Sequence, residues 1–384
     1  MQKRIRIVSV SIILVILLIG IIVMNNNSNN KYSFTQDGIK YALTLDGEKT
    51  SSFPPKGMYK AQVTCVGADG RWLYDEWKLA IENITSDDVT CDINFSTITK
   101  TNLNDYIISL AGSAQGTGQV VNENGYRYEG KNPNNYIWFN NEYWRIIGVF
   151  DSASHGVSGK NLVKIIRADV LDGLAWHKSN TNDWTASSLK SLLNGAYYNA
   201  QDGTSSGYCY GYSTIATANC DYTKRGIQSG YRGMIANVTW YLGGFSRTSA
   251  TTSAFYGYER GTTVYSGRPT STTGYIGLMY PSDYGYSVLS SSCTRTTNLG
   301  SYNSAKCAGQ SWLYGKGYEW TLTPTSSYSS IVFNLSNNGN LNNTDYDYIN
   351  ANNGYGSRPV LYLDASVYKI DGDGSLNNPY IVGL

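Results

Sequence analysis

The stretch Tyr136–Phe150, YIWFNNEYWRIIGVF, predicts the central element of the fold. It contains two runs of residues that favour β-strands, separated by Asn140-Asn141. Asparagine tolerates the positive φ angles that a two-residue hairpin turn requires, so a β-hairpin is expected here. Apolar side chains then lie on both faces, which places the hairpin inside a sheet and not at its rim. The cross-strand pairs expected from this register are Trp138 with Tyr143 and Ile137 with Trp144.

The segments that follow the hairpin predict a larger domain that covers residues 98–384. Residues 162–168, LVKIIRA, predict a third strand that extends the hairpin to a meander. Apolar residues at helical spacing predict helices that begin at Asn102 and near Trp184, and a less regular helix is predicted at 232–244. We therefore expect an α+β domain with long loops on a mainly antiparallel sheet. Further strands are expected at 275–279, 320–324, 330–336 and 358–363, and a final turn at Asp371–Gly374.

The segment 31–97 has a different pattern, in which short strands are separated by Asp-Gly and Pro-Pro turn signals. Apolar and polar residues alternate along these strands, which predicts one buried face and hence a small β-sandwich. We expect an immunoglobulin-like topology for it. A polar spacer, NNNSNN at 25–30, precedes this domain, and a domain boundary is expected near residue 98. The expected strands lie at 41–45, 58–65, 76–84 and 89–95.

The composition argues against nucleic acid as a partner. The net charge is only +2 over 384 residues, and no basic run follows residue 6. Charged residues make up 15% of the chain, below the roughly 25% usual for globular proteins. Tyrosine (34 residues) and glycine (40 residues) are abundant instead. This composition is typical of an uncharged, aromatic surface with many tight turns.

The N-terminal residues 1–24 predict a membrane anchor. The apolar run Ile7–Met24 follows three basic residues, and as a helix it is about 27 Å long, enough to cross a bilayer core. The basic flank is expected in the cytoplasm, so that the bulk of the chain lies outside a cell membrane that it spans once. The membrane is thus an expected partner, through Ile7–Met24. The alternative is a cleaved signal peptide, although no A-x-A-like cleavage site follows the run.

Six cysteines follow the apolar run, and an even number in an exported chain favours disulfide bonds. They fall into couples that are close in sequence, although other pairings remain formally possible. No C-x-x-C spacing occurs and the chain has only two histidines, so neither a structural zinc site nor a metal cofactor is expected. The couples are Cys65 with Cys91, Cys209 with Cys220, and Cys293 with Cys307.

Four segments of the larger domain carry a resemblance to known proteins. They are WFNNEYWRIIGVF (138–150), WTASSLKSLLNGAYY (184–198), IGLMYPSDYGYS (276–287) and GSRPVLYLDASVYKIDGDGSLNNPYIV (356–382). Together they resemble a domain of unknown function found on many bacterial surface proteins. Their order is similar to the C-type-lectin-like fold shared by formylglycine-generating enzymes and the variable proteins of diversity-generating retroelements. The resemblance implies that fold, and in the variable proteins it implies a binding surface of aromatic and polar loop residues. The enzymes use a cysteine-based copper site, whereas the cysteines here are expected in pairs, so that activity is not carried over.

No residue set in the sequence predicts catalysis. His155 and His177 have no cysteine nucleophile or G-x-S-x-G elbow to act with. The acid pairs at 345/347 and 371/373 are two residues apart, which is poor evidence for two carboxylates across a cleft. The segment DGDGSLNNPY (371–380) lacks the later ligands of a calcium loop and is interpreted as a turn.

A binding surface is the favoured interpretation of the aromatic residues among amides in the later loops. Such residues give flat contact area and adaptable hydrogen bonds, as in antibody paratopes and sugar-binding sites. The alternative is that the tyrosines fill the core, and Arg358 can equally be a structural ion-pair partner. The predicted ligand-binding residues are Tyr284, Trp312, Tyr314, Tyr346, Tyr348, Asn350, Asn353, Tyr355 and Arg358.

The sequence therefore predicts a membrane-anchored, extracellular bacterial surface protein that binds a glycan or a protein through its loops and is not an enzyme. Two alternatives remain: an exported polysaccharide hydrolase, and a structural envelope component without a small ligand. Two carboxylates converging in one cleft would favour the hydrolase. Tyrosines buried beneath smooth polar loops would favour the structural component.

Overall fold

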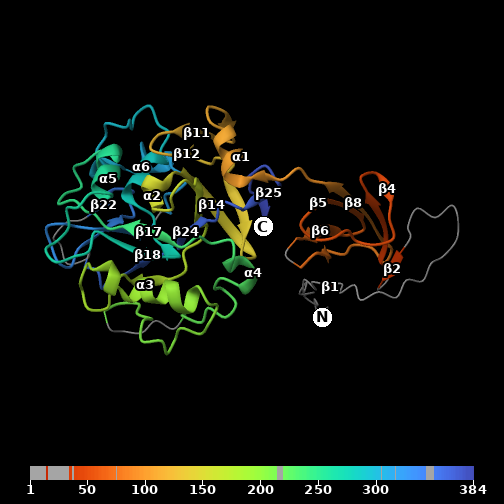
Figure 1. Cartoon of the computed structure of the whole chain (residues 1–384), viewed down its shortest axis with the longest axis horizontal. Coiled ribbons are helices and arrows are strands. Elements are labelled where there is room, and N and C mark those ends of the chain that lie inside the picture. The colour runs from red at the N-terminus through yellow and green to blue at the C-terminus, as the bar shows by residue number, and fades with distance from the viewer. Residues whose placement is uncertain are drawn as a thin grey trace, which may run out of the picture. The chain divides into compact units, whose positions relative to one another are not determined.

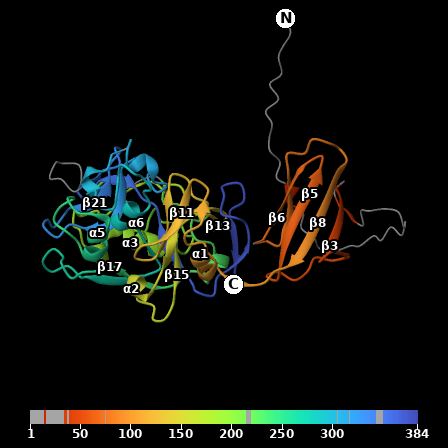
Figure 2. The same cartoon turned by 90° about the horizontal axis from the view of Figure 1, so that it is seen from above.

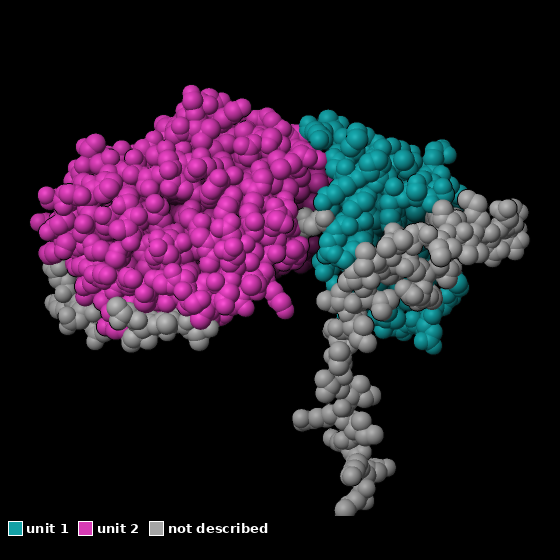
Figure 3. Space-filling model, turned by 60° about the horizontal axis from the view of Figure 1, so that its bottom comes forward, with its two compact units in different colours: residues 1–100 teal, residues 101–384 magenta. Residues whose placement is uncertain are grey.

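The computed structural model describes residues 14–15, 34–36, 39–74, 76–213, 219–303, 305–315, 317–342 and 350–384. The chain divides into two compact units, residues 1–100 and 101–384 (Figures 1 and 3). Strands account for 36% of the structure and helices for 15%, in several sheets. The predicted α+β class is therefore wrong, and the fold is mainly β. The expected helices are short or replaced by strands, because few segments keep a helical spacing for more than two turns.

Unit 1 is a sandwich of two sheets around one apolar core. One sheet has the order β2-β3-β8-β5 with β4 beside β3, and the other has the order β1-β7-β6. Buried residues alternate with partly exposed ones along β8, as expected for a strand with one face on the core. The strands are β1 (Leu14–Val15), β2 (Phe34–Gln36), β3 (Ile39–Leu45), β4 (Glu48–Lys49), β5 (Tyr59–Val66), β6 (Asp69–Leu73), β7 (Lys78–Glu82) and β8 (Val89–Thr97).

The predicted transmembrane helix falls on residues 1–24, of which the structure describes only Leu14 and Val15. Within the described ranges, no helix has the length and apolar character needed to cross a bilayer. Most of the predicted anchor lies outside the described residues, but Leu14 and Val15 form β1, which pairs antiparallel with Ala80 and Ile81 of β7. The run contains many β-branched isoleucines and valines, which favour strands as readily as helices.

Three disulfides confirm the prediction that the cysteines are bonded. They join Cys65 to Cys91, Cys209 to Cys220, and Cys293 to Cys307. The first links residues directly opposite each other on β5 and β8, with the Cα atoms 4.1 Å apart. Because such bonds persist in oxidising compartments, they indicate an extracellular or secreted protein.

Unit 2 is organised around an 11-stranded main sheet with β14 near its centre (Figures 1 and 2). One edge of β14 pairs with β13 and then β12, and its other edge pairs with β15. The hairpin, its register and the meander are thus as predicted. The strands are β9 (Thr101–Asn102), β10 (Ala114–Gln115), β11 (Gly118–Asn122), β12 (Tyr126–Gly130), β13 (Tyr136–Phe139), β14 (Glu142–Phe150), β15 (Leu162–Arg167), β19 (Ile276–Gly277), β24 (Val360–Leu363), β25 (Tyr368–Asp371) and β26 (Tyr380–Gly383).

A second, five-stranded sheet and a separate two-stranded pair complete the β-structure of unit 2. The second sheet contains β16 (Gly173–Ala175), β20 (Glu319–Pro324), β21 (Val332–Leu335), β22 (Leu341–Asn342) and β23 (Gly354–Gly356), and the pair is β17 (Val238–Tyr241) with β18 (Ser271–Gly274). The helix predicted at 232–244 is wrong: only Arg232 is helical, and Val238 and Trp240 are the buried residues of a strand with alternating exposure.

The helices of unit 2 are short and connect the sheets. Residues 184–197 form a 3₁₀ turn, one α-turn and a π-helix in succession, where one helix was predicted. Residues 281–286, for which no helix was predicted, form a helix in which Asp283 accepts the Tyr280 N–H. The helices are α1 (Leu103–Ser109), α2 (Ser152–His155), η1 (Trp184–Ala186), α3 (Ser188–Leu192), η2 (Leu193–Tyr197), α4 (Ser229–Arg232), α5 (Thr252–Glu259), α6 (Pro281–Tyr286), η3 (Leu299–Ser301) and η4 (Ala308–Gln310).

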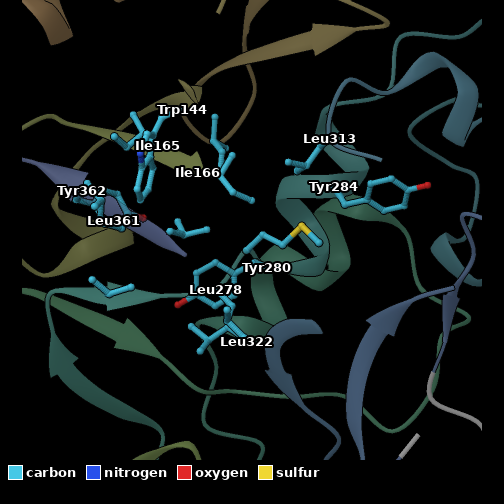
Figure 4. Close-up of a cluster of buried hydrophobic side chains, with 14 of the residues drawn as sticks. Trp144, Ile165, Ile166, Leu278, Tyr280, Tyr284, Leu313, Leu322, Leu361 and Tyr362 are labelled. Carbon is cyan, nitrogen blue, oxygen red and sulfur yellow. The ribbon is translucent and has the colours of Figure 1, made fainter. Parts of the chain in front are cut away.

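One continuous apolar core fills unit 2 and includes many of its tyrosines. Side chains of β14, β15 and β24 lie opposite those of β20 and the segment around α6 (Figure 4). Tyr280, Tyr284 and Tyr362 are at most 1% exposed. Tyrosine in this protein is therefore a core residue as well as a surface residue, which limits what its abundance indicates about binding.

The hairpin turn at Asn140 and Asn141 generates a test of the central element. Both residues have positive φ angles, 58° and 59°. Asn140 is buried and also fastens the turn to the loop before α4, since its Nδ2 donates to Gly226 O at 3.0 Å and its Oδ1 accepts the Gln228 N–H at 2.8 Å. Asn141 is exposed.

We expect Asn140→Gly to lower the free energy of unfolding by about 1–3 kcal/mol, because buried backbone groups lose their partners. Asn141→Gly keeps the permitted backbone and is expected to cost less. Urea unfolding of both variants, followed by intrinsic fluorescence, measures the difference. The reverse order would show that the Asn140 hydrogen bonds do not hold the turn.

Candidate functional site

Three of the predicted binding residues lie in or against the core. Tyr284 is 0% exposed, and its hydroxyl donates to Gly339 O at 2.7 Å. Trp312 is buried, and its Nε1 donates to Tyr128 O at 2.8 Å. The Tyr314 hydroxyl donates to Asn337 O. The polar atoms of Tyr284 and Trp312 are hydrogen-bonded to backbone carbonyl groups within the protein. These two side chains therefore stabilise the fold and have little exposed surface for a ligand.

Arg358 forms a buried ion pair, the structural role that the sequence left open for it. Its Nε and Nη2 donate to the two carboxylate oxygens of Glu319 at 2.6 and 2.9 Å, and Nη2 also donates to Leu313 O at 2.6 Å. Burial is the main influence on Glu319 and raises the pKa of its carboxyl. Removing either partner would leave a buried charge without its counter-charge, so the pair stabilises the fold only while it is intact.

The remaining predicted residues cluster at the β23 end of the second sheet or lie outside the described residues. Tyr346 and Tyr348 lie outside the described ranges. Asn350 forms an isolated bridge with Ile331. Asn353 is buried, and its Nδ2 lies 3.5 Å from the hydroxyl of the half-buried Tyr355. The structure therefore brings Asn353 and Tyr355 together, whereas Tyr284 is buried in the core.

An exposed group of aromatic and apolar side chains lies where β16 pairs with β23. We call it the tyrosine surface. The rings of Tyr318 and Tyr355 are stacked, with centroids 5.1 Å apart and an interplanar angle of 20°. Trp320, which is 0% exposed, lies behind Tyr355 at 4.6 Å. Val170 (42%) and Tyr318 (43%) are exposed and Tyr355 is half-buried. Tyr208 (46%) and Tyr212 (53%) are exposed on the loop 208–213, whose backbone is hydrogen-bonded to the same part of the second sheet.

Backbone hydrogen bonds hold the loop 208–213 against this part of the second sheet. Ala175 N–H donates to Tyr210 O at 2.8 Å, and Ser213 N–H donates to Asn352 O at 2.6 Å. A Cβ at Gly354 would lie 2.1 Å from Gly211 O, so only glycine permits this approach. The Cys209–Cys220 disulfide closes the same loop. The loop tyrosines are therefore presented by a braced backbone.

Among the described residues, the charged groups near the tyrosine surface include Lys178, Asp172 and Arg225, and each has a partner. Lys178 Nζ lies 3.3 Å from the Tyr210 hydroxyl and 5.0 Å from the centre of its ring. Asp172 is paired with Arg225 at 2.8 Å. Among the described residues, no group of three or more histidine, cysteine, aspartate or glutamate side chains could hold a metal ion. The surface can stack on flat apolar faces and exchange hydrogen bonds with hydroxyl groups.

The two histidines have structural hydrogen bonds. His155 Nε2 lies 3.1 Å from Phe150 O, and its Nδ1 accepts the Val157 N–H at 3.1 Å. His177 Nδ1 accepts the Ser179 N–H at 2.9 Å. Burial is the main cause that lowers the pKa of both rings, which favours the neutral form. Both rings are thus used to order the local backbone.

Most residues of the tyrosine surface were not predicted from the sequence. Tyr208 and Tyr212 lie in the irregular region 202–271, and Tyr318 precedes a strand. A weak signal was present in YCYGY at 208–212, where tyrosines alternate around a cysteine of a short disulfide couple. A short loop closed by a disulfide cannot bury its own side chains, so its aromatics tend to remain exposed.

A second cluster of functional groups is buried between β12, β15, α5 and α6. Asp283 Oδ1 accepts from Arg127 Nη1 at 3.0 Å, and its Oδ2 accepts from Lys164 Nζ at 2.5 Å. All three side chains are at most 1% exposed. Burial lowers the pKa of Lys164 to about 8, although Asp283 opposes the shift. Burial also acts to raise the pKa of Asp283, but the two cations outweigh it and lower that pKa.

Glu259, at the end of α5, fastens the beginning of α6. Its Oε1 accepts the Ser282 N–H at 2.8 Å, and its Oε2 accepts the Ser282 hydroxyl at 2.5 Å and Arg260 Nη1 at 3.1 Å. The side chain is fully buried, and burial raises the pKa of its carboxyl to about 7. The carboxyl of Glu259 therefore changes charge near neutral pH, next to the residue that precedes Asp283.

The raised pKa of Glu259 predicts a pH-dependent stability. Between the model-peptide value near 4.5 and the folded value near 7, the folded protein holds a proton that the unfolded chain has released. The free energy of unfolding should therefore fall as the pH rises through this range, by up to about 1.4 kcal/mol per pH unit from this group. Glu259→Gln should flatten that slope in urea unfolding at about pH 5 and pH 7. Equal slopes in the two proteins would contradict the assignment.

Comparison with models of known protein families, with characterised proteins and with solved structures gives no match to the chain. The function is therefore inferred from the chemistry of the tyrosine surface and of the buried ionic cluster formed by Arg127, Lys164 and Asp283. The tyrosine surface is open to a ligand, whereas the ionic cluster is enclosed by protein. The first is the candidate site for recognition of another molecule, and the second consists of buried ion pairs within unit 2.

Proposed function

We propose that this chain is an extracellular binding protein that recognises an uncharged glycan through the tyrosine surface. The observation that carries the proposal is the partly exposed Tyr318–Tyr355 ring stack beside the disulfide-closed tyrosine loop. The C–H faces of sugar rings pack on aromatic rings, and sugar hydroxyls exchange hydrogen bonds with tyrosine hydroxyls and amides. Asn353 and Tyr355 supply an amide and a hydroxyl at the same place.

The rigidity of the surface supports recognition. Tyr355 is held between Tyr318 and the buried Trp320, so its ring loses little freedom when a ligand binds. The loop 208–213 is braced by its disulfide and by hydrogen bonds to Ala175 and Asn352. Binding to a preformed aromatic surface therefore costs less conformational entropy than binding to a flexible loop.

The sparse charge around the surface favours a neutral ligand over an acidic or basic one. Asp172 is neutralised by Arg225, and Lys178 packs against Tyr210. A protein ligand would in general be selected by complementary charge at its rim. Near this surface the described charged groups include the Asp172–Arg225 ion pair and Lys178, which packs on Tyr210. The neutral glycan is therefore the ligand class that we favour, and binding involves no covalent step.

An extracellular location agrees with the three disulfides and with the resemblance of the larger unit to bacterial surface proteins. We expect the native chain in the envelope fraction or the culture fluid, with no cysteine reacting with a thiol reagent before reduction. Fractionation followed by thiol labelling checks this, and comparison of the two fractions separates a retained protein from a released one. Recovery in the cytosol with reactive thiols would contradict the location.

Glycan-array binding by the disulfide-bonded protein tests the function. Tyr318→Ala and Tyr355→Ala should each weaken binding at least about fivefold, because loss of an anchoring aromatic costs more than about 1 kcal/mol. Tyr355→Phe keeps the ring stack and should retain most of the affinity. Tyr328→Ala is the matched control, since Tyr328 is 42% exposed but lies beyond the other end of β20.

The outcomes of this experiment are distinct. Binding to neutral glycans that is lost in the Tyr318 and Tyr355 variants, but not in the Tyr328 variant, supports the proposal. Binding that survives both alanine variants places recognition elsewhere. A folded protein that binds no glycan but does bind a protein partner would overturn the choice of ligand class.

A further inference from the structure

Lys164 of β15 and Asp283 of α6 touch inside unit 2, although 119 positions separate them in the sequence. Lys164 Nζ lies 2.5 Å from Asp283 Oδ2, and the two side chains are 0% and 1% exposed. We propose that these side chains form an intramolecular amide bond between Lys164 Nζ and Asp283 Cγ. The proposal assigns a covalent cross-link to the protein and is independent of the ligand of the tyrosine surface.

Burial increases the share of Lys164 in its nucleophilic, uncharged form. Four aromatic rings enclose Nζ, and they belong to Tyr280, Tyr362, Phe150 and Trp240, with ring centres at 4.4, 5.6, 5.7 and 5.9 Å. These rings and the Asp283 carboxylate favour the ammonium ion, but burial outweighs them and lowers the pKa of Lys164 to about 8. A desolvated lysine amine is the usual form of an activated amine nucleophile in proteins.

The carboxyl group of Asp283 is held by donors on both oxygens. Arg127 Nη1 donates to Oδ1 at 3.0 Å, and the Tyr280 N–H donates to Oδ2 at 2.9 Å. Attack on Cγ places negative charge on Oδ1, where the guanidinium of Arg127 would stabilise it. Arg127 is itself held by Glu123 O at 3.0 Å and by the rings of Phe150 and Tyr286.

Spare hydrogen-bond donors lie beside the pair. Arg127 Nη2 and Tyr362 Oη are buried and have no hydrogen-bond partner within the described part of the chain. Unpartnered buried donors are rare in folded proteins because each loses its hydration without replacement. Arg127 Nη2 belongs to the guanidinium that already bonds Asp283 Oδ1, so it can donate to an intermediate that carries more negative charge on oxygen than the carboxylic acid does.

The step balances with the atoms that are present. A proton passes from the Lys164 ammonium to Oδ2 along the existing hydrogen bond, and the amine lone pair then forms the N–Cγ bond. The Cγ–Oδ2 bond breaks after a second proton moves from nitrogen to Oδ2. Of the three ammonium hydrogens, two leave with Oδ2 as water and one remains on the amide nitrogen. No oxidant, reductant or activating group is required.

Proximity and exclusion of water favour the amide. In bulk water the separated ions are more stable, because both groups are hydrated and water is abundant. In this enclosure neither group is hydrated, and two groups held in contact can have effective concentrations of about 10⁵ M or more. The same enclosure keeps water from the completed bond and so slows its hydrolysis.

The amide bond would join residues that are much farther apart in the sequence than those joined by the disulfides. The disulfides span 26, 11 and 14 residues, so each joins segments that are near in sequence. The amide would join the main sheet at β15 to α6 and would not be opened by thiols. It would thus keep unit 2 cross-linked after its disulfides have been reduced.

Mass spectrometry of the wild-type full-length chain tests the proposal directly. After reduction and alkylation, the protein should be lighter than its sequence predicts by one water molecule. Trypsin should then fail to cut after Lys164 and release a branched peptide that joins residues 161–167 to residues 261–295. The branched peptide is decisive, because Asp-Gly sequences such as Asp46-Gly47 can also lose one water by cyclisation.

Variants separate the cross-link from general effects on folding. Lys164→Met and Asp283→Ala should each restore the calculated mass. Lys40→Met is the matched control, since Lys40 also contacts an aspartate, Asp88, at 2.8 Å, but on the exposed surface of unit 1. It should leave the branched peptide unchanged. Recovery of 161–164, 165–167 and 261–295 as linear peptides of full mass from the folded wild-type protein would overturn the proposal, whatever the variants do.

Discussion

The backbone pairing of β14 is the constraint on which unit 2 depends. Glu142–Phe150 is bonded along both edges, to β13 and β12 on one side and to β15 on the other. Seven of its nine residues are buried. Both edges are thus hydrogen-bonded and most side chains on both faces lie in the core. Its Gly148 is required by this crowding, since a Cβ there would lie 2.3 Å from Tyr126 O. The sheets and helices of unit 2 pack against a core that this strand positions, including the enclosure of Lys164 on the neighbouring β15.

Local chemistry made part of this fold predictable from the sequence. Asn140-Asn141 supplies the positive φ angles of the hairpin, and its two-residue turn fixes the register of the flanking strands, so short-range information was sufficient there. The fold class, mainly β instead of α+β, was not predictable from such short-range information. VTWY at 238–241 has only two inward residues, too few to separate a period of two from a helical period. The N-terminal apolar run is rich in β-branched residues and suits a strand or a helix, and only long-range pairing with β7 decides for Leu14 and Val15.

The candidate site was harder to predict than the fold, because tyrosine serves two roles. Tyr284 and Tyr318 both lie in loop-like sequence with glycine and serine nearby, but the first is buried and bonded to Gly339 O and the second is exposed. The difference arises from contacts between segments far apart in the chain, such as the approach of Gly211 to Gly354. Residue types alone do not encode such contacts. The ionic cluster was hidden for the same reason, since Arg127, Lys164 and Asp283 come from three separate segments.

The parallel pairing of β3 with β8 in unit 1 determines how that unit bears mechanical load. Ile39–Leu45 pairs in register with 89–95, and β3 lies early in the unit whereas β8 ends it. A force pulling on the start of β3 and the end of β8 therefore slides the two parallel strands past each other. Their hydrogen bonds are then strained together instead of one after another, as they would be if a hairpin were peeled open. The Cys65–Cys91 bond locks β8 to its other neighbour, β5. Unit 1 thus has a geometry suited to tension along the chain.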